Sequence, residues 1–542
     1  MAAGSTVPAA PRGSRGRGCH GASTGLSPAE AYRAAMDLMW NYDLEGAKRL
    51  LEPWRGTLAW HAGAYAECFA LRVVLTGRRS DAAATLELVC TAEVLCEALE
   101  AKAEGAAQQI LAAELLLLRS GLQLLLGARF RAAFNLRQCW GAYRRLEQRL
   151  GAQADWPAER ESALQPEDLR GRLCFGLGVF YLATSLLPVG LSPLARLAGF
   201  VVHRPQGKAY LAECAEQGLG PRATLAAILL SLYHLDIEPD VRRAGELLVA
   251  SLGQRPENVL LHWSGSFLAW RNTCIAQALE MTDKALWCCG EELGGKAIYL
   301  RYELGTLRFI AMDWPGAQPH LRFVHESVRA GGVFFPHAVV VAAQLAAVAF
   351  SLGEEEEGER LCREAAVPRE ALASLRLEAD LVELLQLFLR RRREARALLA
   401  FEVMYLLRQL SRAPAALLRK ILARLAELTP PVPSELAAEA QRLMDACGPR
   451  AVRCVLLFYL GEAQTAAADA PELAALCARL PAWGTYLAAH GLYWCGRVLA
   501  LSGQRAAALR CLREARARRR YPFDIHDKIC KVIEETEAMP SG

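Results

Sequence analysis

The sequence predicts an all-α protein, an α-solenoid in which consecutive helix pairs stack into a right-handed superhelix. A recurring spacing is the main evidence: a small residue, then Ala twelve positions later, then larger or apolar residues four and three positions further on. Glycine or aspartate falls between the halves of several copies and proline near their ends, as expected at helix boundaries. No stretch alternates apolar and polar residues between turn signals, as a strand would.

Three copies carry this spacing, the first of them cleanly. They are Gly496–Ala508–Leu512–Ala515, Gly305–Ala317–Leu321–Val324 and Leu232–Ala244–Leu248–Ser251. Small residues are needed where the two helices of a pair cross, because larger side chains would push the backbones apart. The apolar residues then fill the groove against the next pair. The spacing is that of the 34-residue tetratricopeptide repeat, which builds a concave surface and favours binding over catalysis.

Weaker copies extend the pattern along the chain. Ala35, Ala47, Leu51 and Trp54 predict a first helix pair over residues 28–54. The other weak copies are Gly121–Ala133–Trp140, with Arg137 at a usually apolar position; Ser266–Ala278–Ala285, whose register is ambiguous by one residue; and Ala346–Cys362–Ala365, with Gly358 where alanine is usual.

The segments between the copies define the expected organisation. Residues 1–27 predict a disordered tail, residues 28–428 an N-terminal and central repeat block, and residues 435–542 a C-terminal block. The proline-rich residues 429–434 predict a hinge between the blocks, because proline interrupts helices. Residues 371–427 are expected to form one or two long helices. They include Arg390–Arg393, interpreted as a solvated face or, alternatively, a patch for phosphate or an acidic partner.

Composition excludes several classes of protein. An apolar content of 53% over 542 residues excludes a largely disordered chain. The net charge of +5 is spread over many residues, so no nucleic-acid partner is predicted. Seventeen scattered cysteines without a CxxC motif favour reduced thiols in the cytoplasm. The uncharged stretches 173–195 and 333–353 are interpreted as buried solenoid helices, with membrane insertion of the first as the alternative.

Motifs for catalysis are absent from the sequence. It contains no glycine-rich phosphate loop followed by Lys-Ser/Thr and no HExxH, and its single GxSxG match, GASTG at 21–25, lies in the predicted disordered tail. His320 and His325 are five residues apart, which places them on different faces of a helix and argues against a shared metal. We therefore predict a non-enzymatic protein without catalytic residues, cofactor or metal.

The predicted inner face of the solenoid is rich in aromatic side chains. Aromatic residues and arginine are typical of the energetically dominant contacts in protein interfaces, although aromatic residues at helical spacing also occur in cores. The predicted partner-binding residues are Trp263, Phe267, Trp270, Tyr299, Tyr302, Phe309, His490, Tyr493 and Arg497. The expected partner is a peptide or helix of another protein lying in the groove.

Chaperone tails are not the expected partner. Repeats that bind them hold a C-terminal carboxylate with Lys and Asn at positions 5 and 9. Those positions here hold Tyr32 and Met36, Leu118 and Leu122, Tyr302 and Thr306, and Tyr493 and Arg497. The carboxylate clamp is therefore absent, since a buried carboxylate would find too few donors.

Four phrases of the sequence resemble the tetratricopeptide repeat protein 39 family. They are AYRAAMDLMWNYDLEGAKRLLEP (31–53), FGLGVFYLATSLLPVGLSPLARLAGF (175–200), FEVMYLLRQL (401–410) and RYPFDIHDKICKVIEE (520–535). The chain departs from the family at VVHRPQG (201–207), where an acidic Gly-Asp-Arg type motif is usual. The resemblance implies an intracellular, non-enzymatic adaptor. The chain is also similar, more distantly, to a fungal inclusion-body clearance protein linked to lipid droplets. This similarity keeps a role close to a membrane as an alternative.

The function predicted from the sequence is therefore a cytoplasmic scaffold or adaptor that serves a large assembly, such as cilium assembly or a ubiquitin-ligase complex. The alternative is a peripheral membrane or lipid-droplet protein that docks through the apolar 173–200 hairpin and the arginine run. The sequence leaves the identity of the partner and the oligomeric state open.

Overall fold

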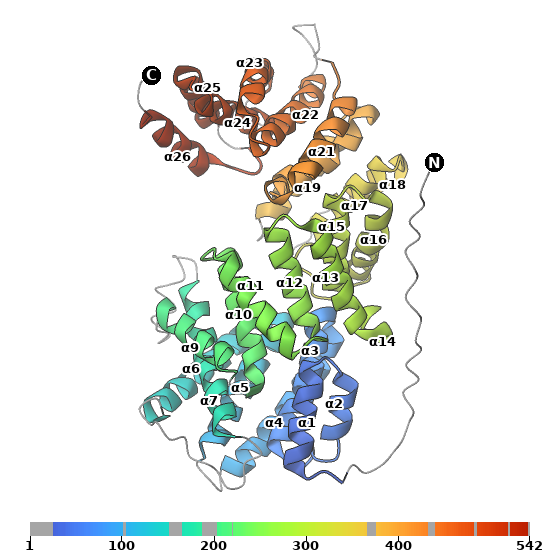
Figure 1. The fold of residues 1–542 in the computed structure, drawn as a ribbon. Coiled ribbons are helices and arrows are strands. Elements are labelled where there is room, and N and C mark those ends of the chain that lie inside the picture. The colour runs from blue at the N-terminus through green and yellow to red at the C-terminus, as the bar shows by residue number, and fades with distance from the viewer. Residues whose placement is uncertain are drawn as a thin grey trace, which may run out of the picture.

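The computed structural model describes residues 25–100, 105–150, 165–186, 203–218, 220–365, 376–431, 440–481, 485–518 and 521–539. Within these ranges the chain forms helices and no strand, and a single isolated bridge joins Arg78 and Val333. Neighbouring helices pack in consecutive pairs along a curved array (Figure 1). The predicted all-α solenoid is confirmed.

The helices of the first half are α1 (Pro28–Trp40), α2 (Leu44–Leu51), α3 (Ala59–Thr76), α4 (Arg79–Glu100), α5 (Ala106–Leu125), α6 (Arg129–Leu150), α7 (Pro166–Ser185), α9 (Arg204–Glu216), η1 (Gly220–Arg222), α10 (Ala223–Asp236) and α11 (Val241–Gln254). The central helices are α12 (Val259–Arg271), α13 (Ile275–Cys288), α14 (Gly290–Gly294), α15 (Ile298–Ile310), α16 (Trp314–Ala330), α17 (Ala338–Ser351) and α18 (Glu355–Ala365). The remaining helices are α19 (Arg376–Leu389), η2 (Arg393–Leu398), α20 (Leu399–Leu406), η3 (Leu410–Arg412), α21 (Ala415–Leu428), α22 (Ala440–Tyr459), α23 (Ala463–Arg479), α24 (Leu487–Leu501), α25 (Arg505–Ala517) and α26 (His526–Glu537).

Local sequence signals explain the first helix pair. Ser27 and Glu30 form a reciprocal capping box at the start of α1, and Pro28 occupies the first position of this helix. The side chain of Asp43 accepts a hydrogen bond from the backbone N–H of Gly46 at 3.0 Å and so caps α2. The pair predicted over residues 28–54 is confirmed.

Close packing at the small residues of the repeat is also confirmed. A Cβ atom added to Gly496 would lie 2.4 Å from Leu512 Cγ, and one added to Gly305 would lie 2.8 Å from Leu321 Cγ. At Gly358 the added atom would lie 2.4 Å from the ring of Phe350. Glycine at these positions therefore lets the two helices of a pair approach.

One predicted copy is out of register by one residue. Gly121 and Ala133 are exposed, whereas Ser120, Ala132 and Cys139 are completely buried. These three keep the spacing of twelve and seven, so the copy in α5 and α6 is displaced by one position from the prediction. Arg137 is consequently exposed, and Leu136 takes the apolar position. The Ser266–Ala278–Ala285 register is correct, because all three residues are fully buried.

The interpretation of residues 371–427 as one or two long helices is wrong. The described part of this segment forms α19, α20 and α21, separated by the short 3-10 helices η2 and η3. The solvated interpretation of Arg390–Arg393 is also wrong for Arg391, whose side chain is completely buried. Its guanidinium donates to Glu402 Oε1 at 2.5 Å and lies 3.6 Å from Asp445. Arg390, Arg392 and Arg393 are exposed.

The apolar core crosses the predicted hinge. α21 ends at Leu428, directly before the TPPVP segment, and residues 432–439 lie outside the described part. A single hydrophobic cluster nevertheless includes both Leu425 on α21 and Leu443 on α22. The two predicted blocks thus share buried apolar contacts, and a hinge at this position stays a prediction. Of the predicted tail, residues 1–24 lie outside the described ranges, as do residues 187–200 of the predicted apolar hairpin. No helix in the described ranges has the length and apolar character needed to cross a membrane.

Candidate functional site

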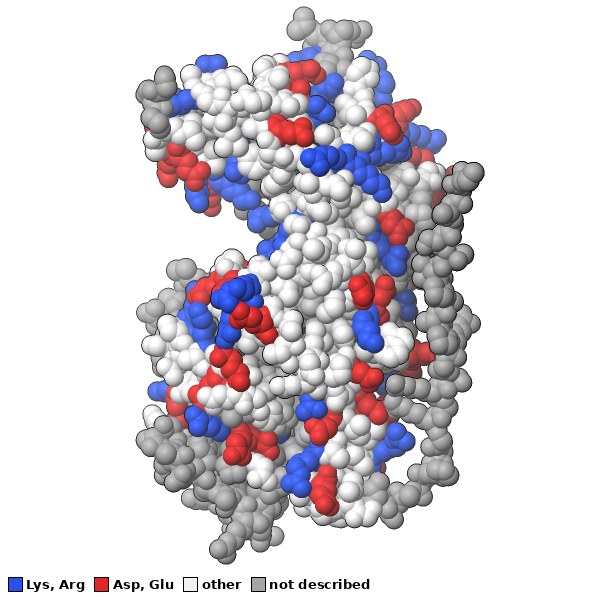
Figure 2. Space-filling model, in the orientation of Figure 1, with Lys and Arg blue, Asp and Glu red and all other residues white. Residues whose placement is uncertain are grey.

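The solenoid is hollowed between its C-terminal helices and the region of α9–α11, and lysine and arginine side chains lie along the wall of the hollow (Figure 2). The C-terminal helices carry a pocket of about 620 Å³. Its side chains come from α19, α22, α24, from α20 and the turn after it, and from α26 and the segment leading into it. Segments more than 100 residues apart in the sequence therefore build one site.

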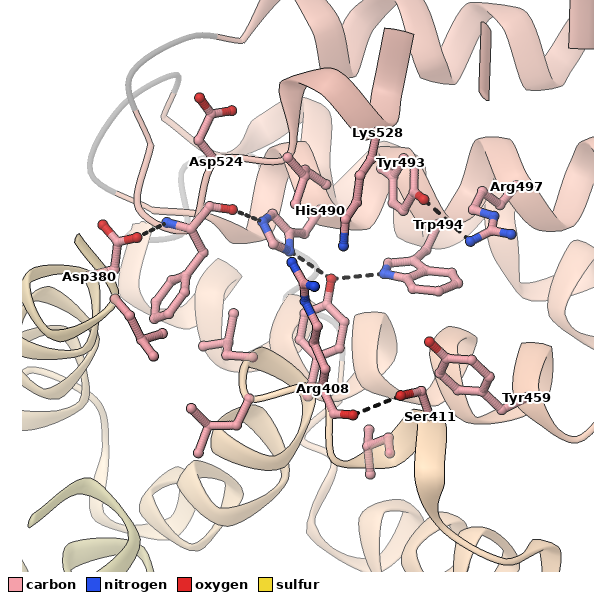
Figure 3. Close-up of a pocket in the computed structure, with 17 residues that line it drawn as sticks. Asp380, Arg408, Ser411, Tyr459, His490, Tyr493, Trp494, Arg497, Asp524 and Lys528 are labelled. Atoms are coloured by element: carbon pink, nitrogen blue, oxygen red, sulfur yellow. Dashed lines mark hydrogen bonds between the residues drawn. The ribbon is translucent and has the colours of Figure 1, made fainter. Parts of the chain in front are cut away.

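A chain of hydrogen bonds forms the floor of this pocket (Figure 3). Trp494 Nε1–H donates to the hydroxyl oxygen of Tyr405 at 2.8 Å, and that oxygen lies 2.6 Å from His490 Nδ1. His490 Nε2 lies 2.8 Å from the carbonyl oxygen of Phe523, which can only accept. The proton of the neutral ring is therefore assigned to Nε2, and Tyr405 donates to Nδ1.

Burial keeps this histidine neutral. It lowers the pKa of His490 to about 4, although the hydrogen bond to Phe523 acts in the opposite direction. Each polar group of the chain from Trp494 to Phe523 is satisfied, so the floor is rigid and is not a proton donor near neutral pH.

Three cations lie above this floor. Arg408 and Lys528 are exposed and Arg497 is half-buried. Arg497 donates to the hydroxyl of Tyr493 at 3.3 Å and lies over the rings of Phe458 and Trp494 at 4.5 and 5.3 Å. Partial burial lowers the pKa of Lys528, and the positive charges of Arg408 and Arg497 lower it further. Within the described ranges none of the three cations forms an ion pair with a carboxylate.

Two acidic residues also line the pocket, but their carboxylates hold backbone groups. Asp380 Oδ2 accepts from the N–H of Phe523 at 2.9 Å. Asp524 Oδ1 accepts from the N–H of His526 at 2.9 Å. In Figure 3 both carboxylates lie on the side of His490 away from Arg497. Positive charge therefore remains uncompensated at the end of the pocket that contains Arg408, Lys528 and Arg497.

Arg408 occupies a backbone position that favours glycine. It has φ 58° in the turn that ends α20, where its N–H donates to Tyr405 and the next N–H to Met404. The turns that end α17 and α24 have the same hydrogen-bond pattern with Gly353 and Gly503 at the positive φ, and the turns that end α1, α12 and α15 have it with Tyr42, Thr273 and Met312. A non-glycine residue at positive φ costs on the order of 1 kcal/mol. The chain thus places an arginine into the pocket at the expense of local strain.

The predicted site residues fall into separate groups. His490, Tyr493 and Arg497 come together in the pocket, although His490 and Tyr493 are only 3% and 5% exposed. Trp263 and Tyr299 stack at 6.3 Å, and Tyr299 stacks on Phe335 at 5.6 Å. Tyr302 contacts the same Phe335 ring edge-on. The central aromatic residues therefore pack mainly against one another.

The remaining predicted aromatic residues differ in exposure. Phe309 is a wrong prediction: it is completely buried against Trp314 and has no surface for a partner. Phe267 is half-buried beside Trp263. Trp270 is half-buried, and the guanidinium of Arg412 lies over its ring at 5.1 Å. One partner contact was thus assigned to a side chain that belongs to the core.

Sequence reasoning missed Tyr405, Arg408, Tyr459 and Lys528 as pocket residues. A signal was present for three of them, because Tyr405 and Arg408 lie in the family-like phrase 401–410 and Lys528 in the phrase 520–535. No described group of three or more His, Cys, Asp or Glu side chains is arranged to hold a metal. Tyr32 occupies one of the positions that would form a carboxylate clamp. Its hydroxyl accepts a hydrogen bond from the guanidinium of Arg172 at 2.7 Å in a buried cluster, so it cannot bind a peptide carboxylate.

Comparison with known proteins gives one family match. Residues 33–287 match the family described as Iml2/Tetratricopeptide repeat protein 39. Similar solved structures include the yeast Tom70 crystal structure, at 12% identity and TM-score 0.30, covering 94% of this chain and 95% of that one. IFIT1, as a monomeric mutant with Gppp-AAAA, is 13% identical with TM-score 0.36, covering 83% and 91%. The P58(IPK) TPR domain is 10% identical with TM-score 0.24, covering 94% and 98%.

Proposed function

Because the chain belongs to the Iml2/tetratricopeptide repeat protein 39 family through residues 33–287, we propose that it is a non-enzymatic scaffold that binds a partner protein on its concave side. The observation that carries the proposal is the C-terminal pocket, where Arg408, Arg497 and Lys528 lie among aromatic walls and form no ion pair with any carboxylate that the structure describes. Arginine and aromatic side chains in a hollow are typical of protein interfaces. The proposed location is the cytoplasm, and cilium assembly or a ubiquitin-ligase complex is the kind of assembly it would serve.

Proximity labelling of the full-length protein in cells tests this function. The variant Lys528→Glu reverses one pocket charge at an exposed position and should leave the fold intact. Lys531→Glu is the matched control, since Lys531 lies on the same helix with its side chain 77% exposed and outside the pocket. A discrete set of proteins should be lost with Lys528→Glu and retained with Lys531→Glu. If the two variants label the same proteins as the wild type, the pocket is not the partner site.

The alternative is a peripheral membrane or lipid-droplet protein. It rests on the apolar 173–200 stretch, of which residues 187–200 lie outside the described ranges, and on the arginine run. The burial of Arg391 weakens it, because one arginine of the run already pairs with Glu402 inside the protein. Recovery of the full-length protein with membranes or droplets, unaffected by Lys528→Glu, would favour this alternative over the scaffold.

A further inference from the structure

We propose that the C-terminal pocket is a receptor for a phosphorylated side chain of the partner protein, with Arg408, Arg497 and Lys528 as the groups that bind the phosphate. The proposal rests on the scaffold function above and specifies the chemistry of the partner segment. It follows from the charges and the walls of the pocket.

The cations of this pocket differ from the buried arginines of the same protein. Arg222 donates through Nε to Glu114 at 2.8 Å, and Arg172 pairs with the same carboxylate. Arg391 pairs with Glu402. In the protein interior, each of these guanidinium charges is therefore neutralised by a neighbouring carboxylate. In the pocket, three cations converge without one, and Lys528 is close enough to Arg408 and Arg497 for their charges to lower its pKa.

A phosphate group fits this arrangement better than a carboxylate does. It carries about −1.5 to −2 charges near pH 7 and offers three strong acceptor oxygens, so one group can contact several cations at once. Two guanidinium groups and an ammonium supply charge-assisted donors for those oxygens. A row of carboxylates along a peptide would need cations spread along a groove, whereas these three lie around one pocket (Figure 3).

The walls of the pocket favour a side chain with an apolar body. Tyr459 is 39% exposed and Trp494 and Phe523 also line the space, with Leu377 and Ile525 beside them. An aromatic ring below the phosphate would pack against these surfaces. A phosphorylated protein side chain supplies both parts. A nucleotide, a lipid headgroup and free phosphate are the competing occupants that the test must separate.

The small number of lysines provides a direct readout. The chain has only eight, so ¹³C methylation of the full-length protein gives few NMR signals, and methylation preserves the lysine charge. The charges of Arg408 and Arg497 act on Lys528, and the other titratable groups that line the pocket are His490, Asp380, Asp524, Tyr405, Tyr459 and Tyr493. Phenyl phosphate should shift the Lys528 signal saturably and raise its pKa, because a bound anion offsets the two arginine charges. The Lys531 signal should not move.

Phenylacetate is the matched probe, with the same ring and a carboxylate in place of phosphate. We expect phenyl phosphate to bind at least tenfold more tightly, and inorganic phosphate to fall between the two. Equal affinity for phenylacetate, or an unmoved Lys528 signal, overturns the phosphate assignment. Stronger binding of AMP or glycerol phosphate than of N-acetyl-phosphotyrosine amide or N-acetyl-phosphoserine amide would overturn the assignment to a protein side chain.

Two variants that keep the fold locate the site. Arg408→Gly introduces the residue that Gly353 and Gly503 supply at two of the equivalent turns, so it should fold at least as well as the wild type while it weakens phenyl phosphate binding at least tenfold. Lys528→Gln should weaken binding similarly, Lys528→Arg should restore it, and Lys531→Gln should leave it unchanged. Unchanged binding in Arg408→Gly and Lys528→Gln overturns the proposal.

Phosphatase treatment separates this inference from the scaffold function. Partners that depend on Lys528 in the labelling experiment are captured on the purified full-length protein before and after dephosphorylation. Loss of capture after dephosphorylation supports the phosphate receptor. Capture that still depends on Lys528 but resists dephosphorylation overturns the phosphate receptor and leaves the scaffold function standing.

Discussion

The replacement of Gly496 by alanine tests the close packing on which the repeat depends. Gly496 lies in α24, and an added Cβ would lie 2.4 and 2.7 Å from Leu512 and 3.2 Å from the carbonyl oxygen of Ala508. Gly121 in α5 is the matched control, because an added Cβ there meets nothing within 4 Å. The sequence pattern assigns both glycines to the same position of the repeat, whereas the structure assigns only Gly496 to a helix crossing.

The two substitutions should have effects of opposite sign. In a helix interior, alanine is favoured over glycine by about 1 kcal/mol. At Gly121 that gain is unopposed. At Gly496 the added methyl group forces Leu512 and the neighbouring backbone apart, and overpacking of this kind costs about 1–3 kcal/mol. The expected net effect at Gly496 is a destabilisation of about 1 kcal/mol, so the two variants differ by about 2 kcal/mol.

Hydrogen exchange followed by mass spectrometry is the appropriate assay, because repeat proteins open locally and a single unfolding free energy is poorly defined. Peptides from α24 and α25 should exchange about fivefold faster in Gly496→Ala, since 1.4 kcal/mol corresponds to a factor of ten. Peptides from α5 and α6 should exchange about fivefold more slowly in Gly121→Ala. Slower exchange in both variants would mean that helix propensity outweighs the steric conflict at the helix crossing, and it would refute the packing argument.

Three further predictions concern buried groups. Arg391→Met should destabilise the protein by about 3–5 kcal/mol, because it leaves the carboxylate of Glu402 buried without its cation. The control Arg392→Met, at an exposed position, should change stability by less than about 0.5 kcal/mol. Thermal unfolding of the two variants checks this difference. Phe309→Ala should cost about 3–5 kcal/mol through a core cavity, measured in the same way, and an unchanged midpoint would contradict its burial. The pKa of His490 is about 4 in the folded protein and near 6.5 in the unfolded chain. Between these pH values the unfolded chain binds more protons, so the stability of the fold decreases on acidification, by about 2 kcal/mol at pH 5. His490→Gln should lose this part of the pH dependence of the unfolding midpoint.

The repeat architecture was predictable because it depends on contacts local in sequence. A helix crossing and its apolar neighbours lie within one 34-residue unit, so their spacing is visible in the chain. The register error in α5 and α6 shows the limit of this reasoning. Ser120 and Cys139 satisfy the spacing as well as Gly121 and Trp140 do, and alanine at both 132 and 133 leaves the two registers equal in sequence. Only the burial of these residues in the structure distinguishes the two registers.

The pocket was only partly predictable because it joins distant segments. Arg408, Arg497 and Lys528 are separated by 89 and 31 residues, and no periodicity relates them. Arg391 and Arg392 show the same limit on a smaller scale. They are adjacent and chemically identical, yet one is buried against Glu402 and the other is exposed, because the break between α19 and η2 turns their side chains to different environments.

The placement of charge connects stability and function in this chain. Its deeply buried arginines form clusters with carboxylates, since an unpaired buried charge would cost several kcal/mol. Arg408, Arg497 and Lys528 escape that cost because water reaches the pocket, so the fold tolerates them unpaired. The left-handed turn at Arg408 is shared with Tyr42, Thr273 and Met312, so the inference depends on the three cations that line one pocket and not on the backbone conformation of Arg408. Three cations that line one pocket without an ion pair to any described carboxylate are best explained by an anion that comes from outside the chain.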